Sequence, residues 1–343
     1  MDYRSAGVDI DAATRAMKGI GDLVRGTFTP GTLGDVGTFG GLFQLDREAY
    51  REPVLVASTD GVGTKLKVAF ACARHDTVGY DLVSHCINDI LVQGARPLFF
   101  LDYLALGKLV PEVVEAVVSG LARACREFGV ALLGGETAEM PGFYPPGEYD
   151  LAGTIVGVVE RDAVIDGSSL VPGDLLLGLR STGLHTNGYS LARKIFFEQE
   201  GLKPESPVDE LDMSVGDALL ESHRCYVSLL EGLLEKKLIK AMAHITGGGL
   251  TDNIPRVLPP GTSARIDLGS WSLPPIFRYL RDRGEIAQPE MLRTFNVGIG
   301  MVVMVAENAM EEAKALLSQA GEDPLMIGKI VEGDRQVVYE GLL

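Results

Sequence analysis

Residues 60–65, DGVGTK, combine an acid, two glycines, a hydroxyl and a lysine directly after the apolar run 54–57, VLVA. The apolar run is typical of a buried strand. A carboxylate at the end of such a strand is costly unless it is paired, hydrated or bound to a metal. Glycines let a ligand approach backbone N–H groups, and a lysine can meet phosphate charge. The segment indicates a site for a magnesium-bound phosphate, with an ordinary strand-to-loop turn as the alternative.

Two more expected strands carry an acid at or near their end. Residues 97–106 are interrupted by Asp102, and residues 130–133 lead into a segment that contains Glu136. Neighbouring carboxylates repel one another unless a hard cation lies among them. We therefore predict that Asp60, Asp102 and Glu136 belong to one cluster around magnesium and nucleotide phosphates.

A helix expected from Asp76 to about Gly94 adds polar groups to this prediction. Its apolar stripe is formed by Val78, Leu82, Cys86, Ile90 and Leu91, and its other side carries Asp81, His85, Asn88 and Asp89. An Asn-Asp pair has low helix propensity, which favours a functional role for Asn88 and Asp89.

Two glycine-rich segments open helices in the second half of the chain. They are residues 181–190, STGLHTNGYS, and residues 246–249, TGGG. A helix N-terminus preceded by hydroxyls, an amide and glycines is a candidate anion site. The alternative is an ordinary well-capped helix start, which has the same residue types. His185 and His244 lie in or beside these segments, with a structural role left open for His244. His75 and His223 are expected at the surface, and His85 is expected on a helix face.

The elements that must position these residues fall into two α/β domains. Residues 1–50 form a glycine-rich arm with a short helix within 8–24, and residues 31–41 form either a flexible arm or a loop that orders over a ligand. We expect the first domain at 51–165 and the second at 172–343, separated by the polar, turn-rich segment 161–173. Further helices are expected at 111–128, 190–199, 214–236, 274–283 and 307–320, and strands at 149–160, 175–179, 241–245, 263–268, 297–305, 326–331 and 335–340.

Composition narrows the function classes. The chain has 343 residues, 46% of them hydrophobic, and a net charge of −16, which argues against nucleic acid or an anionic membrane as the main partner. We expect no membrane span and no signal peptide, so the cytoplasm is the default location. The four widely spaced cysteines fit reduced thiols. The sequence contains no P-loop, dinucleotide fingerprint, nucleophile elbow or zinc-spaced motif.

Several segments together resemble the phosphoribosylformylglycinamidine cyclo-ligases, also called aminoimidazole ribonucleotide (AIR) synthetases. They are YRSAGVDID at 3–11, STDGVGTKLK at 58–67, NDILVQGARPLFFLDYLA at 88–105, LLGGETAEMPGFY at 132–144, GLHTNGYSLARKI at 183–195, HITGGGLTDNIPRVLP at 244–259 and RTFNVGIGM at 293–301. Their order and number make this resemblance far more specific than any single glycine motif.

The resemblance implies an α/β (α+β) fold of two domains, the first joining that of a second copy in a homodimer through β-sheet packing. It implies an ATP site without a P-loop in the first domain, near the dimer interface. The implied reaction closes formylglycinamidine ribonucleotide to 5-aminoimidazole ribonucleotide in purine synthesis, with ADP and phosphate released. Phosphorylation of the formamide oxygen makes a leaving group that an amidine nitrogen can displace.

Residue type and motif position, taken together with the resemblance, assign roles to individual residues. Magnesium is assigned to Asp60, Asp89 and Glu136, and catalysis to Lys65, His185 and Asp102, with Lys65 meeting the phosphates. The ATP site is assigned to Asp60, Gly61, Gly63, Thr64, Lys65, Asn88, Asp89, Gly135, Glu136 and Thr137. The ribonucleotide is assigned to His185, Thr186, Asn187, Ser190, Thr246, Gly247, Gly248 and Gly249.

Other members of the superfamily remain as alternatives. A thiamine-monophosphate kinase-like enzyme is possible on general chemistry. Selenophosphate synthetases typically carry a cysteine near the amino-terminal glycine-rich loop, and the hydrogenase-maturation dehydratases end in a reactive cysteine. This chain has its first cysteine at Cys72 and ends in Leu343. A non-enzymatic scaffold that binds nucleotide would require the acidic cluster to be accidental.

Overall fold

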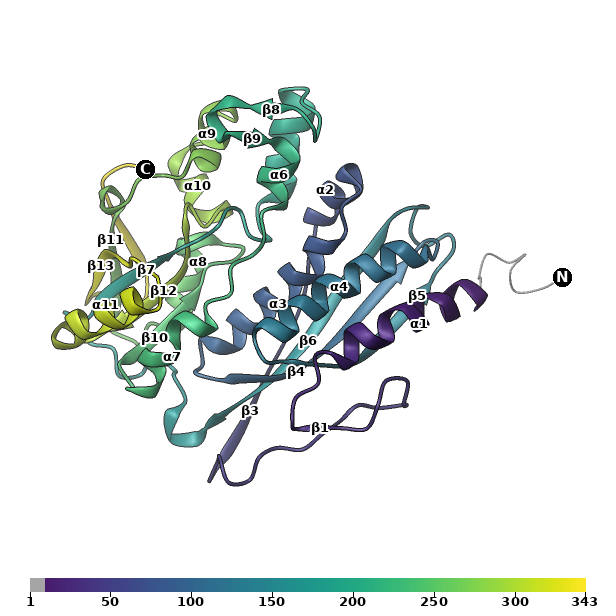
Figure 1. Ribbon diagram of the computed structural model, residues 1–343. Helices are drawn as coiled ribbons and strands as arrows, with labels where there is room; N and C mark the ends of the chain where they lie inside the picture. The colour runs from purple at the N-terminus through teal and green to yellow at the C-terminus, as the bar shows by residue number, and fades with distance from the viewer. Residues whose placement is uncertain (1–9) are drawn as a thin grey trace. The chain divides into compact units, whose positions relative to one another are not determined.

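Figure 1 shows a computed structural model that describes residues 10–343. The chain divides into two compact units, one holding residues up to Ile90 together with Ala95–Arg161, and the other holding Leu91–Gly94 with Asp162–Leu343. We call them unit 1 and unit 2. Most of the segment YRSAGVDID at 3–11 lies outside the described residues.

Unit 1 is built on a four-stranded sheet in the order β3-β6-β4-β5. Its strands are β3 (Pro53–Gly61), β6 (Tyr149–Glu160), β4 (Arg96–Leu106) and β5 (Ala131–Glu139). β6 pairs antiparallel with β3 and with β4, whereas β4 and β5 are parallel. The parallel pair requires a crossover, which α4 (Pro111–Glu127) supplies.

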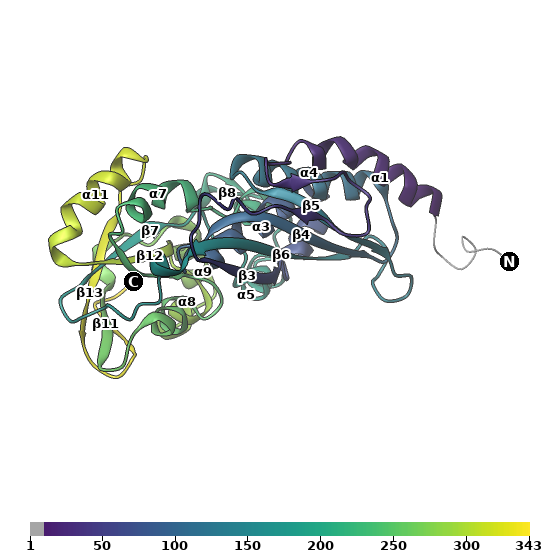
Figure 2. The same ribbon diagram turned by 90° about the horizontal axis from the view of Figure 1, so that it is seen from below.

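Helices cover one face of this sheet (Figures 1 and 2). They are α1 (Ile10–Arg25), α3 (Asp76–Leu91) and α4, and the short helix α2 (Lys65–Cys72) follows β3. Gly79 of α3 and Gly120 of α4 lie where these helices cross, and a Cβ at either position would overlap the backbone of the other helix. The apolar stripe predicted for α3 is confirmed, because all five of its residues are fully buried. The arm contributes β1 (Thr32–Leu33) and β2 (Leu42–Phe43), which pair as a short hairpin.

The opposite face of the sheet exposes apolar side chains. Leu55 is 63% exposed, Tyr103 is 39% exposed and Leu101 is 36% exposed. Register pairs Leu101 with Thr154 and Tyr103 with Ala152, so these side chains share one face. We call it the open face. Residues 54–57 were predicted to form a buried strand, which is wrong, because β3 is an edge strand whose residues alternate between exposed and half-buried.

Unit 2 is built on a six-stranded sheet in the order β10-β12-β7-β13-β11-β14. Its strands are β7 (Leu175–Arg180), β10 (Ile239–His244), β11 (Thr262–Asp267), β12 (Ile299–Val305), β13 (Leu325–Glu332) and β14 (Val337–Glu340). Its helices are α5 (Tyr189–Arg193), α6 (Val215–Leu220), α7 (Val227–Glu235), α8 (Gly249–Asn253), α9 (Pro275–Arg283), α10 (Gln288–Thr294) and α11 (Met310–Gln319). The strands β8 (Pro207–Val208) and β9 (Met213–Ser214) pair as a short antiparallel hairpin. The two units confirm the expected α/β class.

Tertiary contacts change two of the predicted helices. The expected helix 214–236 is two helices, α6 and α7, because residues 221–226 leave the helical path to make specific contacts. Arg224 pairs with Glu322 at 2.5 Å, and Tyr226 donates a hydrogen bond to the carbonyl oxygen of Arg180 at 2.9 Å. The expected helix 190–199 is α-helical only in α5 and continues as a π-helical turn over Lys194–Gln199. The helices α2 and α10 were not predicted.

Three of the four residues on the polar side of α3, Asp81, His85 and Asn88, are buried. Asp81 is completely buried and forms an ion pair of 2.7 Å with Lys65 of α2, which is equally buried. A buried pair of opposite charges is strongly destabilised when only one partner is removed, because the other charge is left uncompensated. This pair therefore fixes α2 on α3.

Lys65→Met should lower the free energy of unfolding by about 3–5 kcal/mol, because it leaves the Asp81 carboxylate alone in the interior. The double variant Lys65→Met/Asp81→Leu removes both charges and should regain most of that loss. Urea unfolding followed by circular dichroism measures all three proteins. A double variant less stable than the single one would contradict an uncompensated charge as the cause.

Candidate functional site

One row of residues crosses the sheet of unit 1 on its helix-covered face. Register pairs Asp60 of β3 with Gly153 of β6, Gly153 with Asp102 of β4, and Asp102 with Gly135 of β5. A Cβ at Gly135 would overlap the Asp102 side chain, and a Cβ at Gly153 would overlap the ring of Phe100. Gly135 therefore makes room for the carboxyl group of Asp102, and Gly153 makes room for the ring of Phe100.

Helix α3 brings Asp89 and His85 to Asp60. His85 Nε2 lies 2.8 Å from Asp60 Oδ2 and 3.6 Å from Asp89 Oδ2, and Ser58 Oγ donates a hydrogen bond to Asp89 Oδ2 at 3.2 Å. We call these four residues the Asp60 cluster. The side chains of Asp60 and Asp89 remain 43% and 24% exposed, so a small ion can reach both carboxylates.

The Asp60 cluster is electrostatically coupled. Burial alone would raise the pKa of Asp60, but the hydrogen bond and the charge of His85 hold it below its usual value. Burial likewise acts to lower the pKa of His85, and its hydrogen bond to Asp60 together with the negative charge of Asp89 raises it overall. His85 is therefore the group beside the two carboxylates that can carry a balancing positive charge when protonated.

The single acidic cluster that the sequence suggested does not form within the described chain. Register pairs Glu136 with Tyr103, whose side chain belongs to the open face, whereas Asp60 and Asp102 point to the helix-covered face. Successive residues of a strand point to opposite faces, so Gly135 lies on the helix-covered face and the Glu136 side chain points to the open face. Asp60 and Asp89 come together as expected, and Glu136 does not join them.

Lys65 is also placed differently from its predicted role. Its ammonium group is completely buried and paired with Asp81, so it is not exposed to a phosphate and the predicted phosphate contact is wrong. Thr64 is the residue before helix α2, Gly63 has a positive φ of 69°, and Gly61 N–H donates to its neighbour Asp60 Oδ1 at 2.7 Å. Asn88 is fully buried. The glycine-rich turn therefore leads the backbone from the Asp60 cluster into α2.

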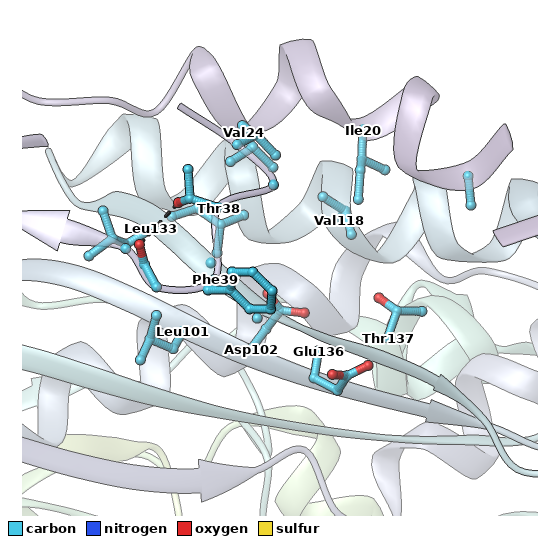
Figure 3. Close-up of a pocket in the computed structure, with 18 of the residues that line it drawn as sticks. Ile20, Val24, Thr38, Phe39, Leu101, Asp102, Val118, Leu133, Glu136 and Thr137 are labelled. Atoms are coloured by element: carbon cyan, nitrogen blue, oxygen red, sulfur yellow. Dashed lines mark hydrogen bonds between the residues drawn. The ribbon is translucent and has the colours of Figure 1, made fainter. Parts of the chain in front are cut away.

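Asp102 lies in a cavity of about 570 Å³ at the β5 side of the sheet (Figure 3). The wall combines apolar residues of α1, α4 and the sheet with the glycine-rich loop 36–41 of the arm and with Gly135, Glu136 and Thr137 of β5. Figure 3 shows the ring of Phe39, from that loop, beside Asp102. Burial in these surroundings raises the pKa of Asp102 to about 7.

In unit 2 the two glycine-rich segments meet. A Cβ at Gly247 would lie 3.2 Å from Asn187 Oδ1, which brings segment 246–249 against segment 181–190. Asn253 holds the second segment in place, donating through Nδ2 to the carbonyl oxygens of Gly247 at 3.2 Å and Gly249 at 2.9 Å. Gly248 has a φ of 97°, a conformation that a side chain rarely adopts.

The hydroxyls, amide and backbone N–H groups of these segments make a polar surface suited to an anion. Its predicted members are Thr186, Asn187, Ser190, Thr246, Gly247, Gly248 and Gly249, and the structure places them on these two adjoining segments. His185 is buried beside them with a positive φ of 62°, an uncommon conformation for a residue other than glycine.

His223 was expected at the surface, which is wrong. It is completely buried, stacks on His185 with ring centroids 4.0 Å apart, and its Nε2 lies 3.1 Å from Nε2 of His244. No local feature of the sequence indicated this contact, because residue 223 lies inside the segment 214–236 that was expected to be one helix. His75, also expected at the surface, is half-buried with Nδ1 at 3.0 Å from the Tyr149 hydroxyl.

Comparison with known proteins defines the class of this fold. Residues 46–159 match the family model of the N-terminal domain of AIR synthase related proteins, and residues 171–341 match that of the C-terminal domain. The chain is 56% identical over 332 residues to the phosphoribosylformylglycinamidine cyclo-ligase of Syntrophotalea carbinolica, with 97% of this chain and 95% of the relative covered. The cyclo-ligase of Geobacter sulfurreducens is 55% identical over 330 residues, with 96% and 95% covered. The chain belongs to the phosphoribosylformylglycinamidine cyclo-ligase family, as its motifs indicated.

Solved structures with the same fold are more distant in sequence. Thiamine-monophosphate kinase from Stenotrophomonas maltophilia superposes with a TM-score of 0.70 at 20% identity, covering 94% of this chain and 96% of that one. The hydrogenase maturation protein HypE in complex with ATP gives a TM-score of 0.64 at 22% identity, covering 94% and 90%. These likenesses establish the fold and nothing further.

The pKa of Asp102 makes stability depend on pH. The folded chain holds this proton up to about pH 7, whereas an unfolded aspartate releases it near pH 4, so the wild-type protein loses stability as the pH rises between these values. Asp102→Asn cannot ionise, and its stability relative to the wild type should therefore increase from pH 5 to pH 8 by about 2–3 kcal/mol, because about two pH units of this range lie below the folded pKa. Urea unfolding of both proteins at the two pH values measures the difference, and a difference independent of pH would contradict a raised pKa.

Proposed function

We propose that the protein uses ATP to close formylglycinamidine ribonucleotide to 5-aminoimidazole ribonucleotide, releasing ADP and phosphate, as a step of purine synthesis. The observation that carries the proposal is the match to named cyclo-ligases over nearly the full length of both chains. The formamide oxygen of the substrate leaves poorly as such, and transfer of the γ-phosphoryl group converts it into a phosphate leaving group. The enzyme must therefore neutralise the phosphoryl charge and hold the substrate folded for attack by nitrogen.

Magnesium suits the Asp60 cluster. Asp60 and Asp89 offer carboxylate oxygens, the ligands this ion prefers, and both groups are partly exposed. His85, which bridges the two carboxylates, already supplies the positive charge that two adjacent acids require. We propose that Asp60 and Asp89 would hold the ion when nucleotide binds, where it would supply positive charge against the phosphates.

The cavity beside Asp102 suits the rest of the nucleotide. Its apolar wall from α1 and α4 can take a planar base, and backbone groups of β5 at Gly135 and Thr137 are available on the edge strand. The loop 36–41 forms part of the wall, so we propose that this segment of the arm closes over bound nucleotide. The ribonucleotide is assigned to the adjoining segments 181–190 and 246–249 of unit 2, with His185 beside its reacting amide.

The open face of unit 1 suits a homodimer. Leu55, Leu101 and Tyr103 form an exposed apolar surface on a sheet whose other face is already covered by helices. Such a surface is usually covered in solution by a partner. We propose that two copies pack these faces together, which also puts Glu136 at the interface, and that the enzyme works in the cytoplasm. Among the described residues, no helix is long and apolar enough to cross a membrane.

Release of ADP, measured with magnesium-ATP in the presence and absence of formylglycinamidine ribonucleotide, tests the reaction. Substrate-dependent release together with a diazotisable aminoimidazole would support the cyclo-ligase. A folded protein without this activity would contradict it, and thiamine monophosphate would then be the next acceptor to assay.

Asp60→Asn and Asp89→Asn should each lower kcat/KM for cyclisation by roughly a hundredfold or more, because a metal-held phosphoryl group loses several kcal/mol of charge stabilisation. Asp46→Asn is the matched control, since Asp46 is exposed and only accepts a hydrogen bond from the N–H of Glu48. Thermal unfolding confirms that each variant folds. Full activity in Asp60→Asn would remove the magnesium assignment.

Leu55→Arg should shift the protein from dimer to monomer, because two open faces cannot bury opposing arginines without a partner charge. Light scattering coupled to gel filtration measures the mass. Met326→Arg, at a residue of unit 2 that is 50% exposed, is the control and should leave the mass unchanged. A wild-type monomer, or a dimeric Leu55→Arg variant, would exclude this interface.

A further inference from the structure

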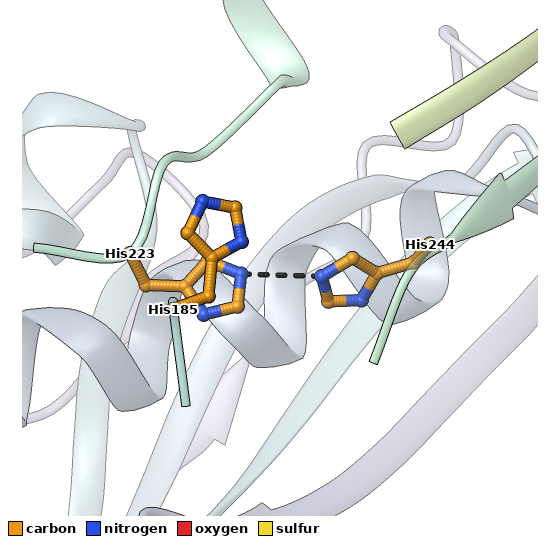
Figure 4. Close-up of side chains that lie close together, drawn as sticks. All are labelled: His185, His223 and His244. Carbon is orange, nitrogen blue, oxygen red and sulfur yellow. Dashed lines mark hydrogen bonds between the residues drawn. The ribbon is translucent and has the colours of Figure 1, made fainter. Parts of the chain in front are cut away.

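Three of the five histidines of the chain meet inside unit 2 (Figure 4). Each of His185, His223 and His244 offers a ring nitrogen within 4.8 Å of the other two, and all three side chains are buried. They come from three separate places in the chain: the segment 181–190, the break between α6 and α7, and the end of β10. We call them the histidine cluster.

The geometry between two of these rings is close to that of metal ligands. Nε2 of His223 and Nε2 of His244 face each other at 3.1 Å, and the dashed line in Figure 4 marks this contact. Two imidazole nitrogens bound to one tetrahedral zinc ion at about 2.0–2.1 Å would lie roughly 3.3 Å apart. The separation of the two nitrogens is therefore close to that of a metal-bound pair, and the rings need to tilt so that both lone pairs point to the ion.

The surroundings of His223 orient it for this role. Thr186 Oγ1 lies 3.4 Å from Nδ1 of His223, on the opposite side of the ring from His244. Metal-bound histidines characteristically use their second ring nitrogen for an outer hydrogen bond that fixes the ring and its tautomer. The Thr186 hydroxyl is such a partner, and it directs Nε2 of His223 towards His244.

His185 is the third member of the set. Its Nε2 accepts a hydrogen bond from the backbone N–H of Thr182 at 3.3 Å, which is long for an N–H···N contact. Exchanging this weak bond for a metal bond requires a rotation of the ring from its stack on His223. Thr182 lies in a part-buried turn at the start of the same segment, where its N–H can turn to water.

We propose that the histidine cluster binds one divalent transition-metal ion of the zinc, cobalt or nickel class, through three imidazoles with a fourth position left open. Neutral imidazole suits these ions, whereas magnesium and calcium prefer oxygen ligands. The site is distinct from the carboxylates of the Asp60 cluster in its ligand chemistry. Because His185 and His244 adjoin the segments assigned to the ribonucleotide, an ion bound here should inhibit cyclisation.

Cobalt(II) titration of the purified protein, with excess magnesium present to occupy carboxylate sites, tests the proposal without any assay of activity. The expected result is one ion per chain with the intense visible absorption of tetrahedral cobalt(II), displaced by zinc. His223→Gln keeps a polar side chain of similar length but removes a ligand, and it should weaken binding at least ~10-fold, the loss that removal of an outer-shell partner alone produces. His75→Gln, in unit 1, is the matched control and should bind as the wild type does.

The outcomes separate the alternatives. Cobalt binding that survives in His223→Gln but is lost in Asp60→Asn would place the ion at the carboxylates and overturn the proposal. No tetrahedral spectrum in a wild-type protein that folds and binds nucleotide would overturn it as well. Inhibition of the wild type by zinc that is relieved at least ~10-fold in His223→Gln would support it, and a failure to observe cyclisation would leave the cobalt result standing.

Discussion

The structure of unit 1 depends on how charge is held under helix α3. Asp60 and Asp102 point from the sheet into the layer that α3 and its neighbours cover, where an uncompensated carboxylate is expensive. Helix α3 places His85 within hydrogen-bond distance of Asp60, and its Asp81 forms an ion pair with Lys65 of α2. A helix that was merely apolar on this side could not lie over such a sheet. The polar side of α3 is therefore a structural requirement as well as the origin of the proposed metal site.

The two carboxyl groups of the sheet row show how local surroundings give two aspartates opposite pKa shifts. Asp60 has an imidazole at 2.8 Å and keeps its charge, whereas burial drives Asp102 towards the neutral form. The partly exposed carboxylate of Asp60 suits a cation. The carboxyl group of Asp102, which keeps its proton up to about pH 7, can donate a hydrogen bond to an uncharged group in its cavity. One nucleotide could use both, with its phosphates near Asp60 and its base near Asp102.

Periodicity in the sequence predicted most of the core, because burial of apolar stripes is the dominant local signal. The apolar stripe of α3 and the strands β6, β7 and β12 followed this rule. The hydrophobic pattern could not show that β3 is an edge strand, because apolar residues occur on its exposed face as well as on its covered face. It also could not show that Arg224 and Tyr226 would interrupt a helix through contacts to distant residues. Both errors have the same cause: the structure at each place depends on contacts, or their absence, with residues far away in sequence.

The same limit explains which site residues could be found in advance. Asp60 and Asp89 were identifiable because each stands out from its own element: an acid ending an apolar run, and an acid inside a helix. Glu136 met the same criterion but was misplaced, because a shift of one residue along β5 changes the face of the sheet. His223 had no local signal at all, since its role arises only where α6 ends and two other chain segments arrive. Chemistry that depends on one element can be read from sequence, and chemistry assembled from three separate segments requires the structure.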